Sequence, residues 1–176
     1  MKISVHAVSV DLLANALANL SHLLEKGHAH AVARKFDPAV LLAARLAPDM
    51  FPLTRQVQIA SDMAKYGVSR LAGIEAPKFD DREQTFEELR TRVARTIDFI
   101  KGVPPGSLEG SEDRIIQVPL RDRTLQLKGL DYLLRWVLPN ALFHVTTTYA
   151  ILRHNGVELG KTDFLTGSGP GFSQSA

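Results

Sequence analysis

The stretch NALFHVTTTYAILRHNG, residues 140–156, has the apolar spacing of a long helix that ends at Asn155 and Gly156. Apolar residues recur every three or four positions, which places them on one helix face. Asn and Gly tolerate the left-handed backbone with which many helices end. The helix is expected to begin near Leu130, and Pro139 predicts a kink or break near Val137–Leu138. The buried stripe is predicted to consist of Leu138, Leu142, Val145, Tyr149 and Leu152.

Three more long helices are predicted on similar grounds. The first, near residues 8–26, carries a leucine every three or four positions and is expected to stop at Gly27, with a bent helical continuation through HAHAVARKF, residues 28–36, as the alternative. The second is predicted to run from Pro52 to about Leu71. The third begins at TFEE, residues 85–88, which is a capping box, and ends at the prolines of GVPPG, residues 102–106.

The shorter segments fit around these helices. Asp37 and Pro38 form a cap and first turn for a short helix, and residues 114–127 have the pattern of a small hairpin in which Pro119 favours an edge position. The fold class predicted is all-α, an up-down four-helix bundle with short extra helices and a minor β-ribbon. Residues 1–166 are expected to form one domain, and residues 167–176, rich in Gly and Ser, a flexible tail.

The composition is that of an ordinary globular protein and excludes several classes. The chain has 176 residues, of which 45% are hydrophobic and 23% charged, with a net charge of +2. There is no Lys/Arg run of the kind that binds nucleic acid. No continuous apolar run approaches the roughly 18 residues of a membrane span. The chain has no cysteine, which excludes disulfides and thiolate chemistry and fits a cytoplasmic location.

His144 interrupts the last helix with a titratable side chain. Asn140 and Thr148 share its helix face, while Gln58 and Asp62 share a face of the second helix. A buried polar group without a partner costs about 1–3 kcal/mol, so the two polar faces are expected to meet, with His144 within reach of Gln58 or Asp62 directly or through water. The alternative is a histidine at the edge of the core with one or two hydrogen bonds. The pocket predicted is lined by Gln58, Asp62, Asn140, His144, Thr148 and Tyr149.

Two segments carry a resemblance to a known family. PDMFPLTRQVQIASDMAKYGVSRLAGIEAPKFDD, residues 48–81, and PNALFHVTTTYAILRHNGVELGKTDFL, residues 139–165, resemble an uncharacterised bacterial family of the DinB/YfiT-like metalloenzyme superfamily. The similarity extends over nearly the whole chain. It implies a DinB-like four-helix bundle, in agreement with the helix periodicity.

The resemblance also implies a divalent metal, nickel or zinc, held by three histidines. One comes from the second helix and two, four residues apart, from the fourth. His144 aligns with the second histidine of that pair, whereas the first falls at Asn140 and the second-helix ligand near Gln58. Asp62 or Gln58 would have to complete the site if a metal bound, and amides are poor ligands for these metals. We therefore expect no tightly held stoichiometric metal and no other cofactor.

Two classes of function remain open. The first is a small-molecule site around His144, and whether it is catalytic stays undecided because a fold does not establish a reaction. The second is a non-enzymatic helical protein that forms a homodimer or binds a partner, for which ARLAPDMFPL, residues 44–53, is a candidate contact. The histidines of GHAH, residues 27–30, are interpreted as a solvated bend, with an adventitious metal site as the alternative.

Overall fold

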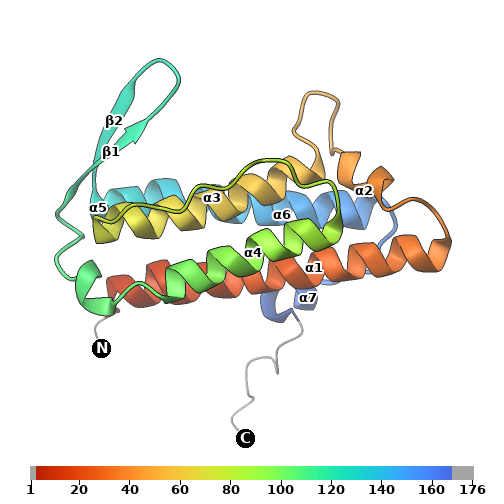
Figure 1. Ribbon diagram of the computed structural model, residues 1–176, viewed down its shortest axis with the longest axis horizontal. Helices are drawn as coiled ribbons and strands as arrows, with labels where there is room; N and C mark the ends of the chain where they lie inside the picture. The colour runs from red at the N-terminus through yellow and green to blue at the C-terminus, as the bar shows by residue number, and fades with distance from the viewer. Residues whose placement is uncertain (1–2, 168–176) are drawn as a thin grey trace, which may run out of the picture.

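Four long helices dominate the computed structural model, which describes residues 3–167 (Figure 1). They are α1 (Leu12–Arg34), α3 (Leu53–Ala72), α4 (Phe86–Lys101) and α6 (Leu138–His154). The short elements are π-helical turns at Ala7–Asp11 and Tyr132–Val137, a 3₁₀ turn at Pro105–Leu108, α2 (Ala39–Ala43), α5 (Gly129–Asp131), α7 (Lys161–Thr166), β1 (Ile115–Pro119) and β2 (Thr124–Lys128). The predicted tail lies outside the described residues, apart from Gly167.

Each long helix packs against two of the others. α3 lies against α4 and α6, and α1 also lies against α4 and α6. The side chains between them are mainly Leu, Val, Ile and Ala, and many of them have no exposed surface. The described part of the chain is therefore mostly helical around one aliphatic core, with a single two-stranded antiparallel sheet beside it.

α3 and α4 run in the same direction (Figure 1). After α3 ends, residues 73–85 return along the length of the molecule, and α4 begins at the same end as α3. The strict up-down order predicted above, in which each helix runs opposite to the preceding one, is therefore wrong at this connection. Periodicity predicts the faces of helices but not the path of a loop, and this path is held by ion pairs that the tertiary structure creates.

α1 continues through Gly27 and ends at Arg34, so the predicted stop at Gly27 is wrong. Gly27 is buried, and a Cβ atom there would lie 2.8 Å from Leu152 Cδ2 and 3.2 Å from Phe86 Cε1. Glycine at this position lets α1 approach α6 and α4 closely. The helix ends instead at Lys35, whose φ of 58° is in the left-handed region.

Several local predictions are confirmed. Thr85 Oγ1 accepts from the backbone N–H of Glu88 at 3.1 Å, and the Glu88 carboxylate accepts from the backbone N–H of Thr85 at 3.0 Å, as a capping box requires. The disturbance expected before Pro139 is the π-helical turn that leads into α6. The predicted ribbon is the β1–β2 hairpin, which turns Ile116 and Val118 toward the core.

The helical stretch Ala7–Arg34 is long and apolar enough, by length and composition, to span a membrane. However, 56% of its most apolar 18-residue window is buried. A core helix of a folded domain has the same property. The continuous apolar run that the sequence analysis looked for is absent because polar residues such as Asn19 and His22 interrupt it.

Candidate functional site

His144 of α6 and Gln56 of α3 form a buried polar pair. Nδ1 of His144 lies 2.6 Å from Oε1 of Gln56. The histidine is 8% exposed and the glutamine 1% exposed. Gln56 Nε2 also donates to the backbone carbonyl of Phe51, at 2.9 Å. The pair therefore joins α6 to α3 and to the segment that precedes it.

The hydrogen bonds of Gln56 determine the tautomer of His144. Because the amide N–H of Gln56 is used by the Phe51 carbonyl, Oε1 is the atom that faces the imidazole. An amide oxygen can only accept, so Nδ1 of His144 carries a proton and donates. Nε2 then carries the lone pair of the neutral ring. Within residues 3–167, Nε2 has no hydrogen-bond partner. It is not fully buried, so its lone pair is accessible.

The imidazole is held in its neutral form. Burial, and to a smaller extent the nearby positive charge of Arg55, lower the pKa of His144 from 6.5 to about 4. Burial disfavours the charged ring, and a neighbouring positive charge repels it. At neutral pH, Nε2 is consequently a hydrogen-bond acceptor.

Neither Gln58 nor Asp62 forms a direct hydrogen bond with His144, whose direct partner is Gln56. Gln58 accepts from Arg55 Nη1 at 3.0 Å and donates to Glu83 at 2.8 Å. Asp62 accepts from Arg92 Nη2 at 2.9 Å and from Lys65 Nζ at 3.0 Å. The polar side of α3 divides into two faces, and Gln56 lies on the one that meets α6.

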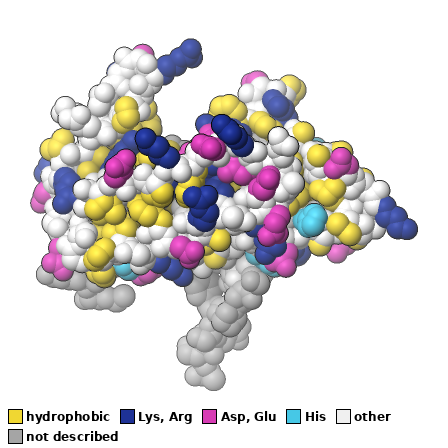
Figure 2. Space-filling model, viewed as in Figure 1, with side chains coloured by type: hydrophobic (Ala, Val, Ile, Leu, Met, Phe, Trp, Pro, Cys, Tyr) yellow, Lys and Arg dark blue, Asp and Glu magenta, His cyan; other side chains and the backbone are white. Residues whose placement is uncertain are grey.

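Arg92 of α4 is the centre of a second polar cluster, which the sequence analysis missed. Its guanidinium side chain is 2% exposed and binds Asp62 at 2.9 Å, Asp81 at 2.9 Å and Glu83 at 2.8 Å. Arg55 also pairs with Asp81. Figure 2 shows basic and acidic side chains intermixed on the face that carries α4 and the 73–85 connection. The signal available in the sequence was an arginine three residues after Leu89, next to the apolar stripe of α4.

The charges in this cluster stabilise one another. Burial by itself raises the pKa of Glu83, but hydrogen bonds from Arg92 and Gln58 and the charge of Arg92 outweigh it, so the pKa is lowered. Burial likewise raises the pKa of Asp81, and hydrogen bonds and charge from Arg55 and Arg92 outweigh it and lower that pKa. Burial lowers the pKa of Arg92, and its carboxylate partners more than compensate and raise it. The cluster fastens the 73–85 connection to α3 and α4 with charge-assisted hydrogen bonds.

Comparison with known proteins assigns the chain to a family. The sequence model described as "Domain of unknown function (DUF1993)" matches residues 5–165. The chain belongs to the DUF1993 family. A crystal structure of a DinB family member protein from Shewanella denitrificans shares 42% sequence identity with this DUF1993 chain, covers 91% of it and 90% of its own length, and superimposes with a TM-score of 0.85. No curated protein matches the chain. The predicted resemblance to an uncharacterised DinB-like family is confirmed.

The other predicted pocket residues of this DUF1993 protein lie apart from the His144 ring. The Thr148 hydroxyl donates to the backbone carbonyl of His144 at 2.9 Å, within α6. The Tyr149 hydroxyl points toward the Leu159 carbonyl, 3.5 Å away, beyond the end of the helix. Asn140 is partly exposed, one turn before His144. The structure therefore brings His144 together with Gln56, not with the set of six predicted from helix faces.

The donor atoms near His144 do not fit the three-histidine metal site that the resemblance implied. No group of three or more His, Cys, Asp or Glu side chains in the described part of the chain is arranged to hold a metal ion. Asp62, the one carboxylate proposed as a ligand, is already neutralised by two cationic side chains. Gln58 is bound to Arg55 and Glu83. The predicted combination of His144 with Asp62 or Gln58 is therefore not assembled.

Proposed function

We propose that this DUF1993 protein is a DinB-like four-helix bundle that binds a small molecule beside His144. The observation that carries the proposal is the 2.6 Å contact between His144 Nδ1 and Gln56 Oε1. It fixes the orientation of the ring and leaves Nε2 as an acceptor for a ligand. A ring orientation set by a second buried side chain is how proteins position a histidine for a ligand.

The pKa of His144 favours binding over proton transfer. A base with a pKa of about 4 holds a proton poorly at neutral pH, so Nε2 is suited to accept a hydrogen bond rather than to remove a proton. We infer a small ligand that donates an O–H or N–H group to Nε2.

We propose that the protein holds no stoichiometric nickel or zinc. The support is chemical: the only imidazole in the region is His144, and the carboxylates of Asp62, Asp81 and Glu83 are paired with basic side chains. Elemental analysis of purified, tag-free protein tests this directly. Close to one zinc or nickel per chain, lost in a His144→Ala variant, would contradict it.

Nuclear magnetic resonance of protein with ¹⁵N-labelled histidine rings tests the binding proposal. At pH 7, Nδ1 of His144 is expected to be protonated and Nε2 to be unprotonated. Small hydroxylated and carboxylic compounds that bind should shift the Nε2 resonance of His144 in the native protein. The same shift is expected in a His28→Gln control, because position 28 is exposed. A ring protonated at Nε2, or a compound that binds equally well to His144→Gln, would argue against the proposed site.

Homodimerisation is the second candidate function. Phe51 is 57% exposed and Phe143 is 55% exposed. Both lie next to the Gln56–His144 pair, because the Phe51 carbonyl accepts from Gln56 and Phe143 directly precedes His144 in the sequence. Leu46 and Leu142 add further exposed apolar surface to the same two segments. Apolar surface of this kind often marks an interface. Light scattering should show a dimer that a Phe143→Ser variant weakens, and a strict monomer at micromolar concentration would contradict the proposal.

A further inference from the structure

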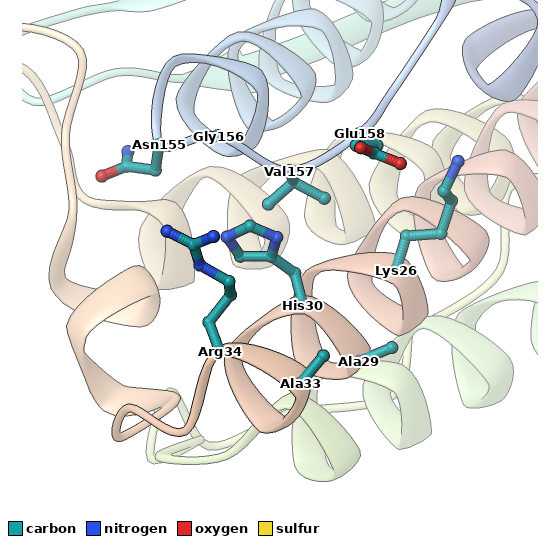
Figure 3. Close-up of a pocket in the computed structure, with 9 residues that line it drawn as sticks. All are labelled: Lys26, Ala29, His30, Ala33, Arg34, Asn155, Gly156, Val157 and Glu158. Carbon is teal, nitrogen blue, oxygen red and sulfur yellow. The ribbon is translucent and has the colours of Figure 1, made fainter.

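A cavity of about 510 Å³ lies between the C-terminal half of α1 and the loop that follows α6 (Figure 3). Its volume is in the range of small-molecule sites. It is separate from the His144 site and is lined by a different set of residues. The polar side chains that line it are Lys26, His30, Arg34, Asn155 and Glu158.

The continuation of α1 past Gly27 creates one wall of this cavity. Lys26, His30 and Arg34 follow one another at intervals of four residues, so they project from the same face of the helix. Figure 3 shows the His30 ring and the Arg34 guanidinium reaching toward the space beneath Asn155 and Gly156. The His30 ring is supported from the other side by an edge contact with Phe36, with 5.9 Å between ring centroids.

The loop passes close to His30 at a glycine. Gly156 has a φ of 89°, a left-handed conformation, and a Cβ atom built there would be 3.9 Å from Nε2 and Cε1 of His30. The Asn155 amide N–H donates to the Ile151 carbonyl at 2.8 Å, which leaves Oδ1 of Asn155 as an acceptor beside the cavity. The backbone of Gly156 and the His30 ring therefore lie side by side at the cavity, whose other polar residues Arg34, Asn155 and Glu158 are exposed to solvent.

The charges in the cavity are divided between its two ends. Lys26 is neutralised by Asp163 at 3.0 Å, which also accepts from His22 at 2.9 Å. Within residues 3–167, neither Arg34 nor Glu158 has an ion-pair partner. Figure 3 shows Arg34 beside His30 at one end, and Glu158 at the other end together with Lys26, whose charge Asp163 balances. The cavity is thus left with a positive end and a negative end.

Helix electrostatics account for part of this arrangement. A basic residue in the last turn of a helix interacts favourably with its dipole, which is sufficient to explain Arg34 as a stabilising residue of α1. That role requires no cavity, no buttressed imidazole and no opposing carboxylate. The cavity, the supported imidazole and the opposing carboxylate together indicate that Arg34 also binds a ligand. A binding measurement distinguishes this role from dipole stabilisation, because a dipole effect changes only the stability of the protein.

We infer that this cavity binds a small dipolar molecule with a carboxylate or phosphate group and an ammonium group. Arg34 and His30 would donate to the oxyanion, for which guanidinium has the matching planar geometry. Glu158 would accept from the ammonium group. Amino acids are the simplest ligands of this chemical class.

A series of amino acids of increasing length tests the inference. Glycine, β-alanine and γ-aminobutyrate are titrated into ¹⁵N-labelled protein while the amide resonances of Gly156 and Glu158 are followed. Butyrate and butylamine serve as matched compounds with one charge each, and O-phosphoethanolamine distinguishes phosphate from carboxylate. At least one dipolar compound is expected to bind about tenfold more tightly than its single-charge counterpart, since each end supplies a charge-assisted hydrogen bond.

Single substitutions test which residue binds the anionic group of the ligand and which binds its ammonium group. Arg34→Met and Glu158→Gln should each weaken binding about tenfold, and Arg135→Met, which removes an exposed arginine on another element, should leave binding unchanged. Thermal unfolding of the same samples reports any dipole effect of Arg34 separately. The inference is overturned if no dipolar compound shifts these amides at millimolar concentration. It is also overturned if the single-charge compounds bind as tightly, or if Arg34→Met changes stability but not binding.

Discussion

Nδ1 of His144 on α6 is 2.6 Å from Oε1 of Gln56 on α3, and this is the contact that joins the polar parts of the two helices. The polar faces of the two helices predict such a junction, but with Gln58 or Asp62 as the partner on α3. Those two residues instead take part in the Arg92 cluster on the other side of α3. The protein therefore separates a neutral polar pair, between α3 and α6, from an ionic cluster, between α3 and α4.

Gln56→Leu should destabilise the protein by about 1–3 kcal/mol, because it leaves the buried N–H of His144 and the carbonyl of Phe51 without their partner. Urea unfolding measures the change. Gln84→Leu, at an exposed position, is the matched control and should alter the free energy of unfolding by less than about 0.5 kcal/mol. Equal effects of the two substitutions would show that the Gln56 contact adds nothing to stability.

Stability should fall as the pH is lowered from 6.5 to 4. The ordinary pKa of histidine, 6.5, applies to the unfolded chain, whereas that of His144 in the folded protein is about 4. In this window the unfolded state binds more protons, so the free energy of unfolding decreases with decreasing pH, by up to about 3 kcal/mol in total. Above pH 6.5 His144 causes no pH dependence.

The His144→Gln variant serves as the control for this pH effect. It keeps the other five of the six histidines, so the difference between the two unfolding profiles isolates His144. The native protein should lose stability relative to the variant between pH 6.5 and 4. Parallel profiles across that range would mean that the imidazole titrates normally. The carboxylates of Asp81 and Glu83, whose pKa values are lowered, contribute stability that is lost at still lower pH.

Arg92→Met should cost about 3–5 kcal/mol of stability, because it leaves Glu83 without its cationic partner and Asp62 with Lys65 alone. Amide hydrogen exchange in residues 74–85 should also become faster, since the ion pairs hold that connection. Arg135→Met is the control: its side chain is 79% exposed and pairs with Asp131 one turn away. That pair should contribute less than about 1 kcal/mol. Unchanged exchange in the connection would show that the cluster does not fasten it.

Gly67→Ala should destabilise the protein, although alanine favours a helix by about 1 kcal/mol over glycine. A Cβ atom at this position would lie 2.6 Å from Cγ1 of Val137, a contact that requires the π-helical turn to move away from α3. We expect a net loss of roughly 1–3 kcal/mol, as for other overpacked sites. Gly106→Ala, where nothing lies within 4 Å, should cause little change. A stabilising Gly67→Ala substitution would disprove the close approach.

The features that the sequence predicted correctly are local ones. The capping box at Thr85 and Glu88 depends on residues three apart, and the disturbance before Pro139 depends on a missing backbone N–H. The hairpin at residues 115–128 follows from its alternation and turn. Each of these depends on neighbours along the chain, and the sequence contains that information directly.

The errors concern residues whose role is set by distant partners. Gly27 has the properties of a helix stop, but α1 continues through it because Leu152 and Phe86 pack against the space that a side chain would fill. Gln56 was passed over because it lies one position from the stripe residue Val57, and nothing within α3 indicates that it meets a histidine 88 positions later. The same applies to Arg92, whose charge is buried only because Asp62, Asp81 and Glu83 converge on it.

The sequence by itself determined the helical composition, the positions of most helix ends and the family resemblance, because these can be recognised from the order and spacing of residues along the chain. The tertiary structure alone decided that α3 and α4 run in the same direction, that His144 pairs with Gln56, and which charges become buried together. The physical reason is that burial and hydrogen bonding of polar groups depend on which surfaces meet. A helix can present several polar faces, and packing of the aliphatic core determines which of them meets a polar partner.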